Sequence, residues 1–328
     1  LKNYAAEMVC RFGLKPGDLV TDIGSNDGTC LSFFKEQGMS VVGVDPATDI
    51  AERATANGVE TVADFFSYDL AVELREKYGT AKYVTSHNAC AHIDDLFDVV
   101  KGVEHWLAGD GVFVLEVGYL VDVYNNIWFD TIYHEHVDYH TVAPFERLFA
   151  RVGMEVIAVD RISPQGGSIR VMVQKRGGAF ERDSSVDELI ALEHELGLDR
   201  AETLCKFDNK ISEVGEKLQN LIQSLKADGE TIAGFGAPTK ATTLMAHFGL
   251  DEGVLDFIVD DNPLKQGLFT PITHIPVLSA DALYERRPDY VLILAWNFAK
   301  PIMKMHIKYS DEIGQFILPM PEPESEIV

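Results

Sequence analysis

Cysteine pairs, long apolar runs and an excess of basic charge are all missing from this sequence of 328 residues. Its four cysteines form no Cys-x-x-Cys pair, so we expect no zinc knuckle or disulfide framework, and a reducing cytoplasm. No apolar run reaches the roughly 20 residues that cross a bilayer. With 28 basic against 52 acidic side chains, the net charge is −24, which argues against nucleic-acid and membrane partners.

The first half of the sequence alternates apolar β-type runs with helical patterns. Two late runs, 154–162 and 167–175, have no long helix between them and predict an antiparallel strand pair. Such alternation is typical of an α/β fold with a doubly wound, mainly parallel sheet. The remaining expected strands are 18–24, 40–45, 59–64, 82–87 and 111–117.

A polar segment, 185–228, has apolar residues at helical spacing and predicts a helical connector. A second, smaller α/β pattern follows, with a helix at 238–249 and a loosely held tail at 321–328. We therefore predict a first domain at 1–178, a connector at 179–228 and a second domain at 229–328. The strands expected in the second domain are 231–236, 254–261, 290–296 and 315–320.

The stretch DIGSNDG at 22–28 follows the first expected strand and opens a helix. Its glycines, Gly24 and Gly28, do not match the G-x-G-x-x-G spacing of dinucleotide-binding turns. Asp45 ends the second strand, where a carboxylate accepts hydrogen bonds from ribose hydroxyls. The pattern predicts a nucleotide-type ligand, and another kind of Rossmann-like protein stays open at this point.

D-x-G-x-x-x-G with an acid about twenty residues later resembles motif I of the class I S-adenosylmethionine methyltransferases. The resemblance implies S-adenosylmethionine as cofactor, with its ribose at Asp45 and its adenine near Asp64 and Phe65. It places Ser86, His87 and Asn88 near the methyl donor. The glycine-turn residues carried over by the motif are Asp22, Gly24, Ser25, Asn26 and Gly28.

The stretch FDTIYHEHVDYHTV at 129–142 gathers three histidines, two tyrosines and three acids just after the fifth expected strand. Three interpretations compete. His136 and His140 share a face if a helix forms, which allows a metal site, but the H-E-x-x-H pattern of zinc peptidases is absent. The side chains could also line a cleft without chemistry. Proton transfer is favoured, because methylation at carbon first requires loss of a proton beside a carbonyl.

Longer motifs resemble the sugar C-methyltransferases, which act on nucleotide-linked keto-deoxysugars. The resemblance spans nearly the whole chain. It implies a class I methyltransferase domain plus a second Rossmann-like domain that binds the nucleotide sugar. The motifs are YHEH at 133–136, QGGSIR at 165–170, GFGAPTKATTLM at 234–245, DDNPLKQG at 260–267 and LAWNF at 294–298.

One departure from that family concerns a small zinc-binding domain with cysteine pairs, which usually comes first. This chain begins at Leu1 and contains no such pairs. Two explanations stay open: the sequence was trimmed, or this member lacks the domain. Oligomer contacts and part of the sugar pocket depend on which is true, and the sequence favours neither a monomer nor a homodimer.

The resemblance also implies catalytic roles. His136 is carried over as the base that removes the proton beside the keto group, and Tyr133 as the group that positions the sugar or the enolate oxygen. Glu135 would orient its neighbours, and His92 would hydrogen-bond the carbonyl oxygen. A surface histidine at a helix start is the alternative for His92.

The second domain supplies candidates for a nucleotide diphosphate, in the family commonly thymidine diphosphate. Backbone N–H groups at Gly236 and the side chains of Lys240 and Lys265 could meet phosphate, and Asp260 or Asn262 the ribose or base. Taken singly, each of these residues could also be an ordinary surface lysine or turn residue with no role in binding. From the first domain, the substrate residues implied are Ser168 and Arg170.

Other activities compete with sugar C-methylation. An O- or N-methyltransferase of a small molecule would explain the cofactor but leave the second domain without a ligand. A non-catalytic module that binds the cofactor or a nucleotide would have no use for YHEH. An oxidoreductase would need the dinucleotide spacing that the glycine turn lacks.

Overall fold

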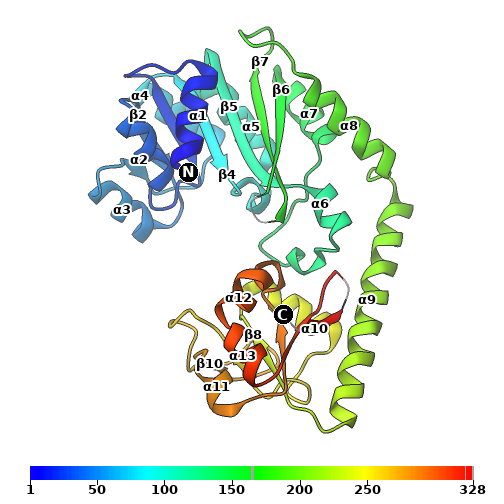
Figure 1. Ribbon diagram of the computed structural model, residues 1–328. Coiled ribbons are helices and arrows are strands. Elements are labelled where there is room, and N and C mark those ends of the chain that lie inside the picture. Colours follow the sequence, from blue (N-terminus) through cyan, green and yellow to red (C-terminus); the bar gives the residue numbers. More distant parts are fainter. Residues whose placement is uncertain (164–165, 322, 327–328) are drawn as a thin grey trace. The chain divides into compact units, whose positions relative to one another are not determined.

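The computed structural model describes residues 1–163, 166–321 and 323–326. Gln165 of the QGGSIR motif and tail residues 322, 327 and 328 lie outside the described residues. The chain divides into two compact units (Figure 1). The first is Leu1–Asp122 with Glu135–Gly197, and the second is Val123–His134 with Leu198–Val328.

The helical connector does not form a unit of its own, which differs from the expected domain plan. It consists of two helices, α8 (Ser184–Leu196) and α9 (Ala201–Ala227). Helix α8 belongs to the first unit and α9 to the second. The two are separated at Gly197, whose backbone is left-handed with φ 66° and ends α8.

The first unit contains the predicted doubly wound sheet, in the order β3-β2-β1-β4-β5-β7-β6. Strands β1 to β5 run parallel, whereas β7 pairs antiparallel with both β5 and β6, as expected. The expected strand at 59–64 is reduced to two residues. The strands are β1 Leu19–Ile23, β2 Ser40–Val44, β3 Thr61–Val62, β4 Ala81–His87, β5 Leu107–Gly118, β6 Met154–Ile162 and β7 Ser168–Lys175.

Helices cover this sheet. Helices α1 and α2 contribute Met8 and Phe34 to a core cluster that also contains Val20, Tyr83 and Val114 from the strands. Helices α4 and α5 pack together, and the right-handed rule for crossovers between parallel strands predicts that they cover the opposite face. The helices are α1 Lys2–Phe12, α2 Thr29–Glu36, α3 Thr48–Ala56, α4 Tyr68–Tyr78, α5 Leu96–Trp106, α6 Leu120–Asn125 and α7 Val142–Ala150, with 3-10 turns η1 Cys90–His92 and η2 Phe129–Thr131.

The second unit has a smaller sheet in the order β10-β9-β8-β11-β12-β13. The expectation of a loosely held tail is wrong, because β13 (Glu324–Glu326) pairs antiparallel with β12. The expected strand 254–261 is only Ile258–Val259. The other strands are β8 Ile232–Phe235, β9 Ile258–Val259, β10 Val277–Leu278, β11 Tyr290–Ile293 and β12 Gln315–Leu318.

The long helix α9 packs against α10 (Thr239–Phe248) within the second unit. At Gly215 a β-carbon would lie 2.7 Å from the Phe248 ring, so glycine is required where the helices approach. Within the described residues, no helix is long and apolar enough to cross a membrane. The remaining helical segments are α11 Ala282–Arg286, η4 Trp296–Phe298, α12 Ala299–Met305 and α13 Ile307–Glu312.

The two units repeat one local design at the carboxyl ends of their strands. In the first, Asp45 after β2 accepts a hydrogen bond of 2.8 Å from Asn26 N in the turn after β1. In the second, Asp260 after β9 accepts one of 2.7 Å from Ala237 N in the turn after β8. Each sheet therefore holds its glycine turn with an aspartate from the next strand, at the edge where open α/β sheets bind ligands.

Candidate active site

A cavity of about 580 Å³ opens at the carboxyl ends of β1, β2 and β4, entirely within the first unit. Its volume lies within the range of roughly 300–1,000 Å³ that is usual for cofactor and small-ligand pockets. It is lined by Ile23, Gly24, Val44, Asp45, Pro46, Asp64, Phe65, Phe66, His87, Asn88, Ala89, His92, Ile93 and Asp94.

Gly24 shows why the first turn needs glycine. Its φ of 77° is left-handed, and a β-carbon there would lie 2.5 Å from the β-carbon of Ala89. Its N–H donates to Val44 O at 2.8 Å, which fixes the turn against β2. Because Gly24 has no side chain, a ligand in the cavity can approach the backbone of the turn closely.

Most cofactor residues predicted from the sequence are at the cavity wall or directly behind it. Phe65 is 76 % exposed, so its ring is available to an adenine. Behind the wall, Ser86 is buried and donates from Oγ to Ile23 O at 2.9 Å. The predicted residues that line the cavity are Gly24, Asp45, Asp64, Phe65, His87 and Asn88, and those that do not are Asp22, Ser25, Asn26, Gly28 and Ser86.

Asp22 is a buried carboxyl group inside β1. Its Oδ1 has no hydrogen-bond partner among the described residues, and burial raises its pKa to about 7. A buried carboxylate without donors is costly, so this group holds its proton to higher pH than an exposed aspartate does. The fold therefore keeps a titrating group two residues from the glycine turn.

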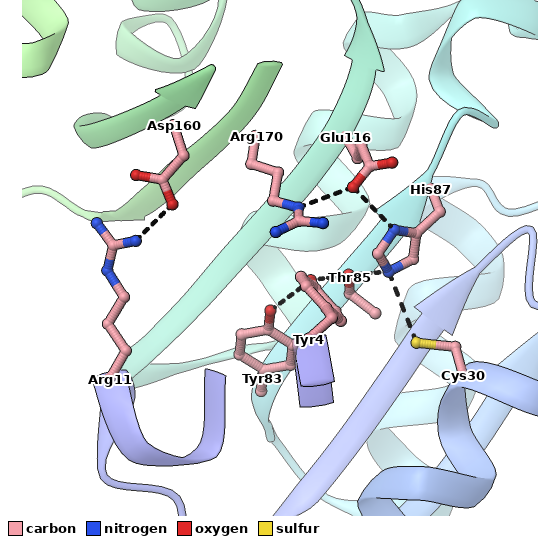
Figure 2. Close-up of polar contacts among 9 residues, drawn as sticks. All are labelled: Tyr4, Arg11, Cys30, Tyr83, Thr85, His87, Glu116, Asp160 and Arg170. Carbon is pink, nitrogen blue, oxygen red and sulfur yellow. Dashed lines mark hydrogen bonds and ion pairs between the residues drawn. The ribbon is translucent and has the colours of Figure 1, made fainter. Parts of the chain in front are cut away.

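His87 belongs to a polar network behind the cavity, which Figure 2 shows. Its Nδ1 lies 3.6 Å from Glu116 Oε2, and its Nε2 lies 3.2 Å from Thr85 Oγ1. Glu116 also accepts a hydrogen bond of 2.8 Å from Arg170 Nε. Although burial raises the pKa of Glu116, its contacts with His87 and Arg170 lower that pKa below its ordinary value. The Glu116 carboxylate therefore fixes a ring that lines the cavity.

Two of the predicted substrate residues are instead part of the sheet interior. Arg170 is bound to Glu116 and its guanidinium lies 4.7 Å from the Tyr4 ring centroid (Figure 2). Ser168 is fully buried where β7 pairs with β5. Ser168 is buried and the Arg170 side chain is 16 % exposed, and their contact with sugar or diphosphate stays a prediction.

The stretch that contains YHEH is an extended loop, not a helix. After η2 the chain has no regular secondary structure through Tyr139, so the shared helix face that a metal site at His136 and His140 requires does not form. Within the described residues, no group of three or more His, Cys, Asp or Glu side chains could hold a metal ion. The loop is tied to η1 by the hydrogen bond from Val137 N to Ala91 O, 2.9 Å long.

His92 and His136 are brought together beside the cavity. Their ring centroids lie 4.9 Å apart with the planes inclined at 50°. His92 Nδ1 lies 2.6 Å from the backbone oxygen of Glu135. A carbonyl oxygen can only accept, so Nδ1 of His92 carries a proton and its Nε2 is the atom that remains for a ligand.

His140 is a packing residue. Its ring stacks on Phe145 with centroids 4.8 Å apart, and burial lowers its pKa to about 4. Glu193 of α8 supports the same region, because it accepts hydrogen bonds from Val142 N at 2.7 Å and Tyr119 Oη at 3.0 Å. The end of the loop is therefore fixed by a buried carboxylate that caps α7.

The second unit has a cavity of about 280 Å³ beside its glycine turn. Of the predicted residues, Lys265 lines it, with Nζ 2.9 Å from Ala237 O. Gly236 N and Ala237 N are used within the fold, by Val259 O and Asp260. Asn262 N donates to Asp260 Oδ1 at 2.8 Å and the Asn262 side chain caps Leu264 N.

Lys240 has polar partners within the second unit that the sequence did not predict. Its Nζ donates to Asn297 Oδ1 at 2.6 Å and lies 3.7 Å from Asp130 Oδ2. Its side chain is only 16 % exposed. This arrangement departs from the sequence expectation and places the lysine in a buried cluster of the second unit.

Several residues at the site escaped sequence reasoning. Glu116 lies two residues before the carboxyl end of β5, and the sequence marked it only as a strand residue, although a position near a strand end was a usable signal. Other cavity residues were not predicted as site residues, and they come from the segments after β2, β3 and β4. They are Pro46, Phe66, Ala89, Ile93 and Asp94.

Comparison with known proteins gives two family matches. Residues 2–159 match a methyltransferase domain, and residues 163–321 match a C-methyltransferase C-terminal domain. A similar relative is the C-methyltransferase NovU of Streptomyces niveus. It is 38 % identical over 313 residues, which cover 95 % of this chain and 74 % of the relative.

Solved structures resemble the methyltransferase part. YcgJ of Bacillus subtilis is 15 % identical, with a TM-score of 0.42, over 54 % of this chain and 100 % of that one. The cyclopropane synthase MmaA2 of Mycobacterium tuberculosis is 14 % identical, with a TM-score of 0.41, over 52 % of this chain and 83 % of that one. These scores add no argument to the family matches.

The family and the cavity agree on the cofactor. The turn at Gly24, the carboxylate of Asp45 and the exposed ring of Phe65 fit the methionine, ribose and adenine parts of S-adenosylmethionine. The fold is the class I methyltransferase Rossmann-like fold with a second α/β domain. The chain belongs to the C-methyltransferase family and is an S-adenosylmethionine-dependent C-methyltransferase.

Proposed function

We propose that this C-methyltransferase acts on a nucleotide-linked keto-deoxysugar, at the carbon beside the keto group. The observation that carries the proposal is the pair of His92 and His136, 4.9 Å apart beside the cofactor cavity. A carbon acceptor needs a base for its proton and a donor for the oxygen that becomes negative. Two adjacent imidazoles supply both functions.

The proton on Nδ1 of His92 determines which role each of the two histidine rings takes. Because Nδ1 donates to Glu135 O, His92 can give a second hydrogen bond from Nε2 only as an imidazolium. In that state it stabilises the enolate oxygen. His136 is then the base that takes the proton, and the positive charge that it gains is offset by the negative charge of the enolate.

Proton and charge balance follow from these assignments. The C–H bond beside the keto group breaks, its proton moves to His136, and its electron pair becomes the enolate, held by His92. When bound, S-adenosylmethionine would supply the methyl group: its sulfur–methyl bond breaks as the enolate carbon forms the new carbon–carbon bond, and the sulfur leaves as a neutral thioether that keeps the electron pair. Tyr133, three residues before His136, is proposed to position the sugar. Glu135 acts through its backbone oxygen, which sets the proton position on His92.

The nucleotide part is proposed to use the second unit. Helix α10 begins at Thr239, which lines the cavity of this unit, and the N-terminus of a helix favours an anion. Lys265 lines the neighbouring cavity with Thr239 and Phe269, which offers a cation for phosphate and an aromatic ring for a base. Asp260 and Asn262 are proposed near the ribose. Thymidine diphosphate is the proposed carrier.

The test is methylation of a panel of thymidine-diphosphate keto-deoxysugars with S-adenosylmethionine. We expect a mass gain of one methyl group and a new carbon–carbon bond beside the keto carbon, located by NMR. A small-molecule panel with hydroxyl and amine acceptors serves as the control. Methylation of oxygen or nitrogen, with no reaction of any keto-sugar, would sink the proposal.

A further inference from the structure

The motifs GAPTK, LAWNF and the segment before YHEH meet in one buried cluster of the second unit. Lys240 comes from α10, Asn297 and Trp296 from η4, and Asp130 from η2. Of these motifs, the sequence had suggested phosphate binding for GAPTK alone. Their convergence inside the unit gives Lys240 a different task.

Asp130 is the centre of this cluster. It is fully buried, and its Oδ2 accepts a hydrogen bond of 2.8 Å from Trp296 Nε1. The Lys240 ammonium lies 3.7 Å from the same oxygen and 5.0 Å from the Trp296 ring centroid. Burial raises the pKa of Asp130 and lowers that of Lys240, so each charge depends on the other.

The segment that contains Asp130, Val123–His134, continues directly into Glu135 and His136 of the YHEH stretch. It lies in the second unit, although the chain on both sides of it lies in the first. Phe129 packs on Phe248 of α10 with ring centroids 5.1 Å apart. Ile127 is left-handed with φ 56°, a strained state for a β-branched residue that persists only where the surroundings impose it.

Short backbone contacts extend this anchor to Tyr133. Ile132 N donates to Phe129 O at 2.9 Å, and Tyr133 N donates to Thr131 O at 3.1 Å. The chain from Asp130 to Tyr133 is therefore a sequence of tight turns. A displacement of the Asp130 carboxylate should therefore also displace Tyr133.

We propose that Asp130 and Lys240 are positioning residues, which anchor Val123–His134 in the second unit and so hold Tyr133 in its place for the reaction. The link to Tyr133 rests on the proposed function, whereas the anchoring itself does not. The second unit thereby has a part in the chemistry that is separate from binding the nucleotide.

Amide hydrogen exchange, followed by mass spectrometry, tests the anchor without any substrate. We expect Asp130→Asn and Lys240→Met each to accelerate exchange in peptides from Val123–His134 by about tenfold or more, because the segment opens locally. Peptides of the cofactor cavity should be unchanged. Lys308→Met, which removes an exposed lysine of the same unit, is the matched control. Unchanged exchange in both variants would overturn the proposed anchor. If Lys240→Met does not fold, the exchange of Asp130→Asn alone decides the test.

A double-mutant cycle with Tyr133→Phe tests the link to the reaction, at a temperature well below every melting point. We expect Asp130→Asn to lower kcat on the keto-sugar by about 10- to 100-fold, with affinity for S-adenosylmethionine unchanged. In the Tyr133→Phe background it should add little further loss. Fully additive losses, or a wild-type kcat in Asp130→Asn, would refute positioning. A wild type that methylates no keto-sugar would refute the proposed function, and exchange would still decide the anchor.

Discussion

At the residue scale, two aspartates near the glycine turn differ because their surroundings differ. Asp45 accepts hydrogen bonds from Asn26 N and Ala47 N, at 2.8 and 2.9 Å, and lines the cavity as a carboxylate suited to ribose. Asp22 has an oxygen without a partner among the described residues and a pKa raised by burial to about 7. Asp45 is therefore a candidate binding group, whereas Asp22 is a buried group whose pKa is raised.

Replacing Asp22 by Asn should change the pH dependence of stability. Between an unfolded pKa of about 4 and a folded pKa of about 7, the folded state keeps a proton that the unfolded state loses. The wild-type free energy of unfolding therefore falls as pH rises through this window, by at most about 1.4 kcal/mol per pH unit. Asp22→Asn removes this contribution, so its stability relative to wild type should rise from pH 5 to pH 6.5.

Urea unfolding of the cofactor-free protein at both pH values measures this difference. Asp64→Asn, a change at an exposed aspartate, controls for a general effect of net charge. Parallel pH profiles for wild type and Asp22→Asn would contradict a buried Asp22 that titrates near neutrality.

At the element scale, the loop that carries YHEH is supported at its middle and at its end by groups distant in sequence. η1 holds its middle through Ala91 O. At its end, Glu193 of α8 caps α7 by accepting hydrogen bonds from Val142 N and Ala143 N, at 2.7 and 3.2 Å. The first turn of α7 thus obtains its cap from another helix, because Thr141 at the N-cap forms no side-chain hydrogen bond.

Glu193→Gln should destabilise the protein by about 1–3 kcal/mol, because it replaces a buried charge-assisted acceptor by an amide whose NH₂ faces other donors. The control is Glu188→Gln, an exposed position on the same helix, where little change is expected. Both are measured by urea unfolding at pH 7. Equal stability of the two variants would remove Glu193 as the cap of α7.

The sequence predicted long elements better than short ones. The antiparallel pair at 154–162 and 167–175 was placed almost to the residue, because continuous apolar runs fix buried strands. Strands β9 and β13 have two and three residues and exist through their neighbours' hydrogen bonds, which no local pattern records. The same reason explains why the tail was misjudged.

The site was predictable where its residues share a motif. Gly24 and Asp45 follow from spacing, and His136 from the resemblance. The contact of Glu116 with His87 and Arg170 joins three strands, and that of Lys240 with Asp130 spans residues far apart in the chain. Such pairings depend on tertiary packing, so a lysine in a glycine-rich turn suggested phosphate when its actual partner is a buried carboxylate.

At the scale of the whole molecule, the two units share one design, and we propose that they bind different ligands. Both sheets place a glycine turn under an aspartate from the next strand, so the strand pattern alone does not say which turn binds S-adenosylmethionine. The larger cavity belongs to the first unit, with its lining drawn from residues 23–94. We assign the cofactor there.

Cofactor binding should therefore protect one unit locally. With S-adenosylmethionine at 100 times its Kd, we expect amide exchange through local opening to slow by up to about 100-fold in peptides of the first glycine turn and of 85–94. Peptides at 232–262 should not change. Comparable slowing at Gly236 would place the cofactor on the second turn and contradict the assignment.

The central claim is that His136 removes a proton from carbon. The most direct measurement is solvent deuterium incorporation beside the keto group of a thymidine-diphosphate keto-deoxysugar, in heavy water without S-adenosylmethionine, for wild type and His136→Ala. The account predicts incorporation by wild type and loss of about 100-fold or more in His136→Ala, with the affinity for S-adenosylmethionine retained. Incorporation at the wild-type rate in His136→Ala would contradict it.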